Sequence, residues 1–241
     1  MDPERMRQAA EKNPLNIQAM FNAIAPKYDL LNHLLSLGQD IGWRKKALSL
    51  VEEKRGGSFL DIAAGSGDFS LEALRLQPKS IVATDFASRM LSMFQEKLER
   101  QRDKRIIHLV TCDALQLPFA HAAFDLVMVA FGIRNFHDRL LGLREMRRVL
   151  KTGGMTLILE LTTPKAGVVK PLYDFYTKFI LPNVGRTVSR HNSAYYYLPA
   201  SIAQFPDEGT FLATMQEAGF VETRAHPLSH GIATIYVGRK Q

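Results

Sequence analysis

Two glycines and several acidic side chains are the residues of this chain whose types and spacing point to chemistry. Residues 61–70 read DIAAGSGDFS, with Gly65 and Gly67 at the centre of the stretch. These glycines let the backbone bend closely around a bound group. A pyrophosphate is an unsuitable ligand because Asp61 and Asp68 would repel it. The stretch also has Ser70 in place of the third glycine of a dinucleotide-binding motif, and it lacks the lysine of a Walker loop. An amine-bearing, cationic ligand fits better.

Further acidic side chains follow the next two predicted strands. Asp85 ends the second strand, where an acid can bind ribose hydroxyls, and Asp113 follows the third strand, near the expected place of an adenine. Ligands of open α/β sheets bind outside the carboxyl ends of the strands, so these acids and the glycine loop would surround one ligand. The combination indicates S-adenosyl-L-methionine as the cofactor. The cofactor-binding residues predicted in this way are Asp61, Gly65, Ser66, Gly67, Asp85, Asp113 and Ala114.

Simpler roles for the same residues stay open. Asp68 could cap the helix that follows it, and Asp85 could cap the helix that begins near Ser88. Asp113 could serve a turn before Pro118. Three acids that each follow the end of a strand nevertheless favour a binding site over three unrelated structural roles.

The loop after the fourth strand should hold the group that the cofactor acts on. It reads FGIRNFHD over residues 131–138 and should face the glycine loop across the crevice of the sheet. The loop lacks the D/N/S-P-P-aromatic motif that is frequent here in methyltransferases acting on nucleic acid bases. Arg134 stays protonated and can hold a developing negative charge, while Asn135 can orient a hydroxyl group or a water. His137 has the best intrinsic pKa for a base, although a surface or capping role is its simpler interpretation.

Hydrophobic periodicity places these loops in an alternating α/β fold. Helices are predicted before the glycine loop, over residues 17–38 with a break at Pro26, and over residues 42–54. Strands are then predicted over 58–64, 80–85, 105–112, 124–131, 155–161 and 231–240, with 221–230 as the hairpin partner of the last. Helices are predicted between them over 70–76, 87–100, 140–150 and 207–220. Near-continuous apolar strands that alternate with amphipathic helices indicate a doubly wound, mostly parallel sheet of seven strands.

The chain is expected to form a single domain with one insertion. We divide it into an N-terminal helical cap (1–55), a cofactor-binding core (56–163), a substrate lid (164–206) and a C-terminal helix with strands (207–241). The insertion is rich in large apolar side chains, which include Tyr173, Phe175, Tyr176, Phe179 and Ile180. Such a stripe is often ordinary core, so a lid is one of two interpretations of it.

Composition and charge exclude several classes of protein. Of the 241 residues, 46% are hydrophobic and 23% are charged, which is typical of a globular chain. The single cysteine, Cys112, excludes an internal disulfide and a thiolate zinc site, and we predict no metal. A polar N-terminus and the lack of an apolar run of transmembrane length predict a cytoplasmic protein. The formal net charge of +7 would attract anionic lipid surfaces, while basic stretches such as WRKK (43–46) are typical of solvated helix faces.

At this point the chain resembles a known family over nearly its whole length, the ubiquinone/menaquinone biosynthesis C-methyltransferases. The resemblance rests on MFNAIAPKYDLLNHLLSLGQDIGWRK, LDIAAGSGD, VAFGIRN and RVLKTGGMTLILEL, and is supported by YYYLPASIAQFP and AGF. Thr152 departs from a common proline, and Thr162 stands where serine is frequent. Ala130 stands where a hydroxyl-bearing residue can contact the cofactor, which puts its own predicted cofactor contact in doubt.

The resemblance implies a class I S-adenosylmethionine-dependent methyltransferase with a Rossmann-like fold. Its acceptor would be a ring carbon of a polyprenylated hydroquinone, and demethylmenaquinol is favoured. The acceptor must be the reduced quinol because an oxidised quinone ring is electrophilic. The predicted catalytic residues are Arg134, Asn135 and Asp68. The predicted substrate-binding residues are Phe131 in the loop that should hold the acceptor and Tyr28, Tyr195 and Tyr197, which would line a path for the prenyl tail.

Other functions compete with this prediction. The same fold could methylate a benzoquinol, another phenol, a lipid or an amine. A nucleic-acid methyltransferase would use the basic charge but lacks its acceptor motif, so no nucleic acid partner is predicted. A non-catalytic cofactor-binding protein and an NAD(P)-dependent oxidoreductase are disfavoured by the FGIRN loop and by the missing third glycine, respectively. Peripheral contact with the inner face of the membrane and assembly into a homo-oligomer stay open.

Overall fold

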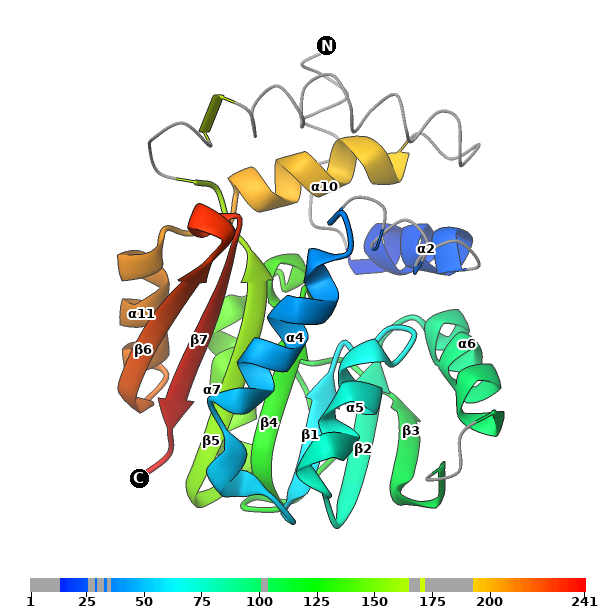
Figure 1. The fold of residues 1–241 in the computed structure, drawn as a ribbon, viewed down its shortest axis with the longest axis vertical. Helices are drawn as coiled ribbons and strands as arrows, with labels where there is room; N and C mark the ends of the chain where they lie inside the picture. The colour runs from blue at the N-terminus through cyan, green and yellow to red at the C-terminus, as the bar shows by residue number, and fades with distance from the viewer. Residues whose placement is uncertain are drawn as a thin grey trace.

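The computed structural model of the protein describes residues 14–25, 29, 33, 36–100, 104–164, 170–171 and 193–241, and at residues 14, 104 and 193–196 it describes the backbone alone. The strands are β1 (Ser58–Ile62), β2 (Ser80–Asp85), β3 (Ile107–Thr111), β4 (Phe124–Ala130), β5 (Leu150–Leu161), β6 (Val221–Leu228) and β7 (Ala233–Arg239). The α-helices are α2 (Pro14–Ile24), α4 (Gln39–Ser49), α5 (Asp68–Ala73), α6 (Ser88–Glu99), α7 (Arg139–Val149), α10 (Ser193–Ala203) and α11 (Glu208–Glu217). A short 3-10 helix, η5 (Ile133–Asn135), follows β4 (Figure 1).

The strands form one seven-stranded sheet in the order β3-β2-β1-β4-β5-β7-β6. The first five strands in this order are parallel, and β7 runs antiparallel to both of its neighbours. The strand order reverses between β1 and β4, which is the point where doubly wound sheets bind their ligands. The predicted fold class and the hairpin of the last two strands are therefore confirmed.

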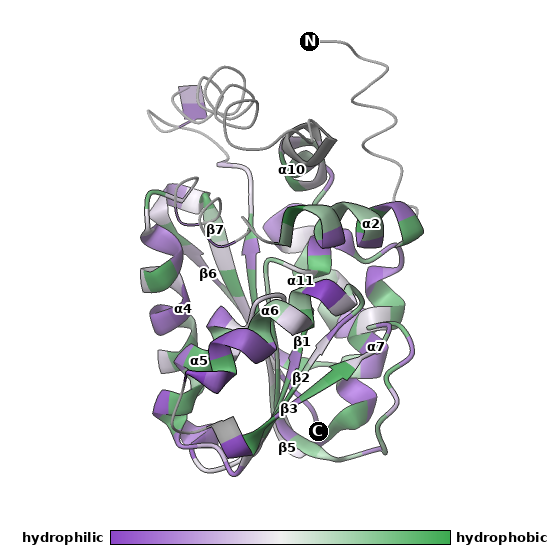
Figure 2. Cartoon of the chain, turned by 90° about the vertical axis from the view of Figure 1, so that its right-hand side faces the viewer, coloured by the Kyte–Doolittle hydropathy of each residue, from purple (hydrophilic) through white to green (hydrophobic). Residues whose placement is uncertain are grey.

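Two hydrophobic clusters pack on opposite faces of this sheet. Successive side chains of a strand point to opposite faces, so Phe59 of β1 joins one cluster and Leu60 joins the other. The first cluster takes its helical residues from α4, α5 and α6, and the second takes them from α7 and α11. Figure 2 shows this arrangement from the side, with α4 and α5 on one side of the sheet and α7 on the other. The parallel strands are covered on both faces, as their near-continuous apolar sequences require.

The helices α2 and α10 lie across the edge of the sheet at which the parallel strands end (Figure 1). The two helices contact each other, and α10 also contacts η5. The predicted break at Pro26 agrees with the end of α2 at Ile24, because proline cannot continue a helix without losing a hydrogen bond. Most of the predicted lid, residues 165–169 and 172–192, lies outside the described residues, and the division into four segments stays a prediction.

The strand β5 begins earlier than the sequence predicts. The pattern placed its start at Met155, after a glycine turn, whereas the strand begins at Leu150. Its pairing with β4 shifts register between Phe124 and Leu126, so the glycines form a bulge within the strand. The backbone N–H of Gly153 donates to the carbonyl of Lys240, which ties this bulge to the end of the chain. Among the described helices, none is long and apolar enough to cross a membrane.

Gly67 lies at the start of α5, where its backbone is left-handed with a φ of 88°. A Cβ atom at this position would lie 2.1 Å from the ring of Phe94, which is fully buried. We predict that Gly67→Ala lowers the free energy of unfolding by about 2–5 kcal/mol, since backbone strain and overpacking add together. Urea denaturation measures the change.

The matched control is Gly56→Ala. Gly56 has a similar φ of 78°, but a Cβ atom there would meet nothing within 4 Å. The free energy of unfolding of this variant should fall only by the cost of the left-handed backbone, about 1–2 kcal/mol. Equal losses in the two variants would contradict the role of the Phe94 contact in holding the glycine loop against α6.

Candidate functional site

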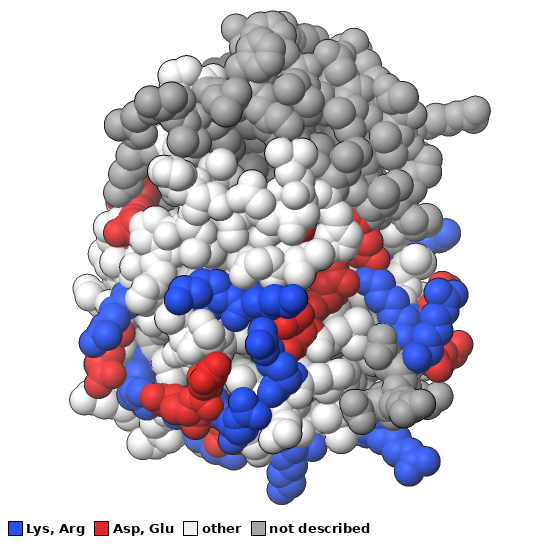
Figure 3. Space-filling view, viewed as in Figure 1, with Lys and Arg blue, Asp and Glu red and all other residues white. Residues whose placement is uncertain are grey.

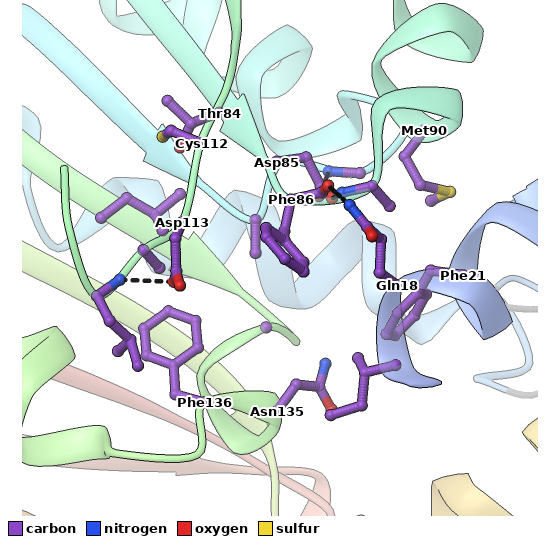
Figure 4. Close-up of a pocket in the computed structure, with 18 of the residues that line it drawn as sticks. Gln18, Phe21, Thr84, Asp85, Phe86, Met90, Cys112, Asp113, Asn135 and Phe136 are labelled. Atoms are coloured by element: carbon purple, nitrogen blue, oxygen red, sulfur yellow. Dashed lines mark hydrogen bonds between the residues drawn. The ribbon is translucent and has the colours of Figure 1, made fainter. Parts of the chain in front are cut away.

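Two adjoining pockets open where β1, β2 and β4 end. The larger pocket lies between these strand ends and α2 (Figure 4). Ala63, Gly65 and Phe131 line both pockets. The remaining lining of the larger pocket includes Ile17, Gln18, Phe21, Asp85, Phe86, Met90, Cys112, Asp113, Ala114, Asn135, Phe136 and His137. The smaller pocket is further lined by Arg44, Asp61, Ala64, Ser66, Asp68, Phe69 and Ala130.

The backbone is strained on both sides of the boundary between the pockets. Ala63 after β1 and Phe131 after β4 have φ values of 52° and 57°, although neither is glycine. Gly132 faces Ala63 so closely that a Cβ atom on Gly132 would lie 2.7 Å from the Cβ of Ala63. Strained residues persist where the surrounding structure holds them, and they gather at functional sites. The strain here brings the predicted acceptor loop directly against the glycine loop.

Asp85 connects the glycine loop to the end of β2. Its Oδ2 accepts a hydrogen bond from the backbone N–H of Gly65 at 2.9 Å, and its Oδ1 accepts one from Ala87 at 2.8 Å. Burial raises the pKa of Asp85 to about 6, although hydrogen bonds from the backbone partly oppose the shift. Asp85 does not cap α6, whose N-cap is Ala87 without a side-chain hydrogen bond, and the carboxylate of Asp85 lines the larger pocket.

The smaller pocket combines the carboxylates of Asp61 and Asp68 with the guanidinium group of Arg44. Arg44 of α4 is 6% exposed, and its Nη2 lies 3.6 Å from Oδ2 of Asp68. Its Nη1 donates to Oδ2 of Asp40 at 2.6 Å, and its guanidinium lies 5.7 Å from the ring centre of Phe131. This pocket can therefore receive one anionic and one cationic group of the same ligand.

Asp61 is fully buried at the end of β1. Its Oδ2 accepts a hydrogen bond from the hydroxyl of Ser70 at 2.6 Å, while its Oδ1 has no hydrogen-bond partner among the described residues. Burial raises the pKa of Asp61 to about 7; the nearby Asp85 adds to the shift, and Ser70 and Arg44 oppose it. A buried acid with an unpartnered oxygen and a shifted pKa is typical of a binding site.

The other predicted cofactor residues divide between contact and support. Ala114 and Asp113 line the larger pocket, and Oδ1 of Asp113 accepts a hydrogen bond from the backbone of Leu115 at 2.9 Å. Asp113 therefore also stabilises the turn before Pro118, which is the simpler role considered for it in the sequence. Ser66 and Ala130 line the smaller pocket, whereas Gly67 supports the loop from behind. Lining a pocket does not by itself show a contact with the cofactor. The cofactor-binding roles of Asp113, Ala114, Ser66, Gly67 and Ala130 therefore stay predictions.

Asp68 does not cap α5. The helix has Gly67 as its N-cap without a side-chain bond, and Oδ1 of Asp68 instead accepts from Nζ of Lys97 at 2.7 Å. Nζ of Lys97 also lies 2.7 Å from Oδ2 of Asp29. Oδ1 of Asp29 accepts a hydrogen bond from the hydroxyl of Ser66. The acid lines the smaller pocket, but a cation already pairs with it. Its predicted role as a proton acceptor stays a prediction.

Arg134 is not among the lining residues of the two pockets, and its side chain makes contacts within its own loop and with β5. Its Nη1 donates to Oε1 of Glu160 at 2.7 Å and also to the carbonyl of Phe131. The backbone N–H of Arg134 donates to Oε2 of Glu160 at 3.1 Å. Arg134 is 5% exposed and Glu160 is fully buried, so the pair fixes the loop after β4 from beneath. These contacts give Arg134 a positioning role in the loop, and its predicted direct contact with a phenolate stays a prediction.

Asn135 follows in the same loop and does line the larger pocket. Its Oδ1 accepts a hydrogen bond at 2.8 Å from the hydroxyl of Tyr197 on α10. Tyr197 is 6% exposed and is not among the lining residues of the two pockets, and its predicted contact with the substrate stays a prediction. Tyr28 and the side chain of Tyr195, both predicted to bind substrate, lie outside the described part of the chain.

Sequence reasoning missed several lining residues. Gln18 and Phe21 come from α2, and the side-chain amide of Gln18 donates to the carbonyl of Phe86 at 2.6 Å. Periodicity alone identifies α2 as an amphipathic helix but not the strand end that it covers. Arg44 belongs to the stretch interpreted as a solvated helix face, which is wrong for this residue. His137, set aside as a surface residue, is exposed but lines the rim of the larger pocket.

Similarity to solved structures defines the class of protein. A methyltransferase from Thermotoga maritima, described as S-adenosylmethionine-dependent and a possible histamine N-methyltransferase, superposes with a TM-score of 0.66. The match covers 92% of this chain and 99% of that one at 17% identity, so it speaks for the fold alone. The fold is that of the class I S-adenosylmethionine-dependent methyltransferases.

Sequence comparison then identifies the family. The chain is 45% identical over 226 residues to the ubiquinone/menaquinone biosynthesis C-methyltransferase UbiE of Geobacter sp. (strain M21), covering 93% of this chain and 96% of the relative. It is 41% identical over 230 residues to the demethylmenaquinone methyltransferase of Bacteroides fragilis (strain YCH46), covering 95% and 94%. The family model of the ubiE/COQ5 methyltransferases matches residues 6–240, and the chain belongs to the ubiE/COQ5 methyltransferase family. The protein is therefore a methyltransferase, and the resemblance noted in the sequence is confirmed.

The raised pKa of Asp61 predicts a stability that depends on pH. The usual pKa is 3.8 and the folded-state value is about 7, so the unfolded chain loses its proton first as the pH rises. The native protein thus loses stability between these two values and levels off above pH 7. We predict that Asp61→Asn, which removes the buried charge, gains stability over the native protein across the same range. Urea denaturation from pH 4 to 8 measures the difference in free energy of unfolding between Asp61→Asn and the native protein.

Asp125→Asn provides a control of opposite sign. Burial raises the pKa of Asp125, but hydrogen bonds from Lys151 and from the backbone of Ser58 outweigh it, so the pKa is lowered. The native protein should therefore be more stable than this variant at neutral pH and lose that advantage in acid. A gap for Asp61→Asn that does not change with pH would contradict the buried charge.

Proposed function

We propose that the protein transfers a methyl group from S-adenosyl-L-methionine to a ring carbon of a polyprenylated hydroquinone in quinone biosynthesis. Demethylmenaquinol, which would become menaquinol, is the favoured acceptor. The observation that carries the proposal is identity of 41–45% over more than nine-tenths of the chain to relatives named for this chemistry.

The charges of the smaller pocket support the cofactor. S-adenosyl-L-methionine carries an ammonium and a carboxylate on its methionine part. The unpartnered Oδ1 of the buried Asp61 suits the ammonium, and the guanidinium of Arg44 suits the carboxylate. The larger pocket adjoins through Gly65 and offers Asp85 to ribose hydroxyls, with Asp113 and Phe136 beside the expected adenine. The residues present therefore fit the group.

When bound, the cofactor supplies an electrophilic methyl group, and the protein must place a nucleophilic carbon in line with it. A hydroquinone ring becomes more nucleophilic as one of its hydroxyl groups loses its proton. Asn135 lines the pocket at the junction with the acceptor loop, where it can bind such a hydroxyl group. The apolar side chains of Ile17 and Phe21 offer α2 as one wall for the acceptor. Arg134 keeps this loop in place through Glu160.

The surface gives little support to a nucleic-acid substrate. Figure 3 shows that basic and acidic side chains alternate over the described part of the face that Figure 1 presents, without a continuous basic surface. A benzoquinol stays the alternative acceptor, since the relative from Geobacter sp. (strain M21) is named for both ubiquinone and menaquinone biosynthesis. The net charge of +7 supports a loose peripheral contact with anionic membrane, where a prenylated acceptor resides.

The direct test is methylation of a reduced quinol by the purified protein. We expect label from S-adenosyl-L-methionine to reach reduced demethylmenaquinol and not the oxidised quinone, because only the reduced ring is nucleophilic. A demethylated benzoquinol assayed in parallel distinguishes the two acceptor classes. Binding of the cofactor without methylation of either quinol would overturn the acceptor assignment and leave the fold class intact.

The charge pattern of the smaller pocket makes a separate prediction. Arg44→Gln should weaken binding of S-adenosyl-L-methionine about 10- to 100-fold, the loss expected for one charge-assisted hydrogen bond. Binding of decarboxylated S-adenosylmethionine, which lacks the carboxylate, should change much less. Calorimetric titration with both compounds measures the difference.

The matched control is Lys45→Gln, an exposed cation on the same helix that should leave both affinities unchanged. Arg44 also pairs with Asp40, so the melting temperature of the variant is recorded alongside its affinities. An equal loss for the two ligands would place the carboxylate away from Arg44.

A further inference from the structure

The side-chain amide of Asn135 lies between the larger pocket and α10. Its Oδ1 is engaged by the hydroxyl of Tyr197 at 2.8 Å, a contact between residues 62 positions apart in the chain. Figure 4 shows the amide nitrogen turned into the pocket, toward the side that carries Phe86 and Gln18, and the oxygen turned away. An amide rotated by half a turn would present its acceptor oxygen to the pocket instead. In the structure the hydroxyl of Tyr197 donates to the amide oxygen, and this hydrogen bond holds the orientation in which the nitrogen faces the pocket.

Asn135 is held by its backbone as well as by its side chain. Its N–H donates to the carbonyl of Gly132 at 3.0 Å, within the short helix η5. The preceding residue, Arg134, is bound to Glu160 through both its backbone and its guanidinium. These bonds fix the backbone at Asn135, so the side-chain amide can still rotate about its own bonds. The hydrogen bond from Tyr197 restrains that rotation.

The hydroxyl of Tyr197 is suited to donate rather than to act as a base. Burial raises its pKa to about 12, with Glu160 adding to the shift and the positive charges of Arg134 and Arg139 opposing it. The group therefore keeps its proton at neutral pH. A protonated hydroxyl facing a carbonyl oxygen donates to it, which leaves the Nδ2–H groups of Asn135 for a ligand in the pocket.

We propose that Tyr197 is a positioning residue that holds the Asn135 amide with its N–H donors toward the acceptor, so that Asn135 stabilises the developing phenolate while the phenolic proton passes to a separate base, for which Asp68 is the predicted residue. The inference rests on the proposed function and adds the polarity of the contact to it. Charge builds on the acceptor oxygen during the reaction, and a donor fixed in advance lowers the barrier. Because Tyr197 belongs to α10, the hydrogen bond makes this polarity depend on how that helix is docked.

The first test is Tyr197→Phe, which removes one oxygen atom and keeps the ring. We expect kcat with reduced demethylmenaquinol to fall about 10-fold, while the affinity for S-adenosyl-L-methionine and the melting temperature stay near those of the native protein. Loss of a whole donor in such a site costs about 100- to 1,000-fold, and loss of its orientation costs less. The matched control is Tyr236→Phe, a buried tyrosine of the core whose loss of hydroxyl should leave kcat unchanged.

A double-variant cycle separates positioning from a general structural role. Asn135→Ala should lower kcat about 100-fold or more, and Tyr197→Phe should add nothing further in that background, because Tyr197 acts through the amide. Losses that multiply in the double variant would overturn the inference. An unchanged kcat in Tyr197→Phe alone would do the same.

Asn135→Asp provides a second test that does not depend on the stability of α10. It keeps an oxygen for Tyr197 but presents an anionic acceptor in place of the donor. We expect kcat to fall at least as far as in Asn135→Ala, because a carboxylate repels a phenolate. A kcat that is higher in Asn135→Asp than in Asn135→Ala would show that a base at this position assists the reaction by taking the proton. That result would overturn the inference. Failure of the native protein to methylate any quinol would instead overturn the proposed function, and this inference with it.

Discussion

Where β1 and β4 lie side by side, the chain segments that leave them turn toward opposite faces of the sheet. After β1 the chain enters α5, which packs in the first hydrophobic cluster, and after β4 it enters α7, which packs in the second. The crevice between the diverging segments is the place for a ligand. Closing it tightly requires the left-handed backbone of Ala63 and Phe131 and the absence of a side chain at Gly132. Every other feature of the site depends on this divergence.

Buried charges around the crevice fall into two kinds. Arg134 and Glu160 form an ion pair at 2.7 Å, and breaking such a buried pair would leave an uncompensated charge, so the pair holds the loop after β4 in place. Asp61 has an oxygen without a partner among the described residues, and its carboxylate is costly to ionise where it lies. A cationic ligand would offset that cost. The protein thus gives up stability at the position where it needs affinity for the cofactor.

Segments from both ends of the chain complete the site above the strand ends. The helix α2 adds Gln18 and Phe21 to the larger pocket, and Asp29 joins the hydroxyl of Ser66 to Lys97 of α6. The helix α10 contributes a hydrogen bond to Asn135 from the other side. A sheet can place carboxylates and glycines at the ends of its strands, but it cannot cover them. The covering helices therefore supply apolar walls and set the orientation of polar groups, which is the basis for the proposed acceptor with a ring and an apolar tail.

The sequence by itself determined the α/β class, the seven strands and the acids at or just after their carboxyl ends, because strand ends are set by local periodicity and by short-range turn chemistry. Asp61, Asp85 and Asp113 could be assigned to one edge of the sheet for that reason. Tertiary structure decided the partners of the charged side chains. Arg134 and Glu160 are 26 residues apart, and only folding showed that the arginine is engaged beneath the loop. Arg44 belongs to a basic stretch whose local pattern is that of a solvated helix, and packing of α4 against the sheet is what buries it. Pairings between residues distant in the chain depend on how helices dock on the sheet, and no local pattern of residue types encodes that geometry.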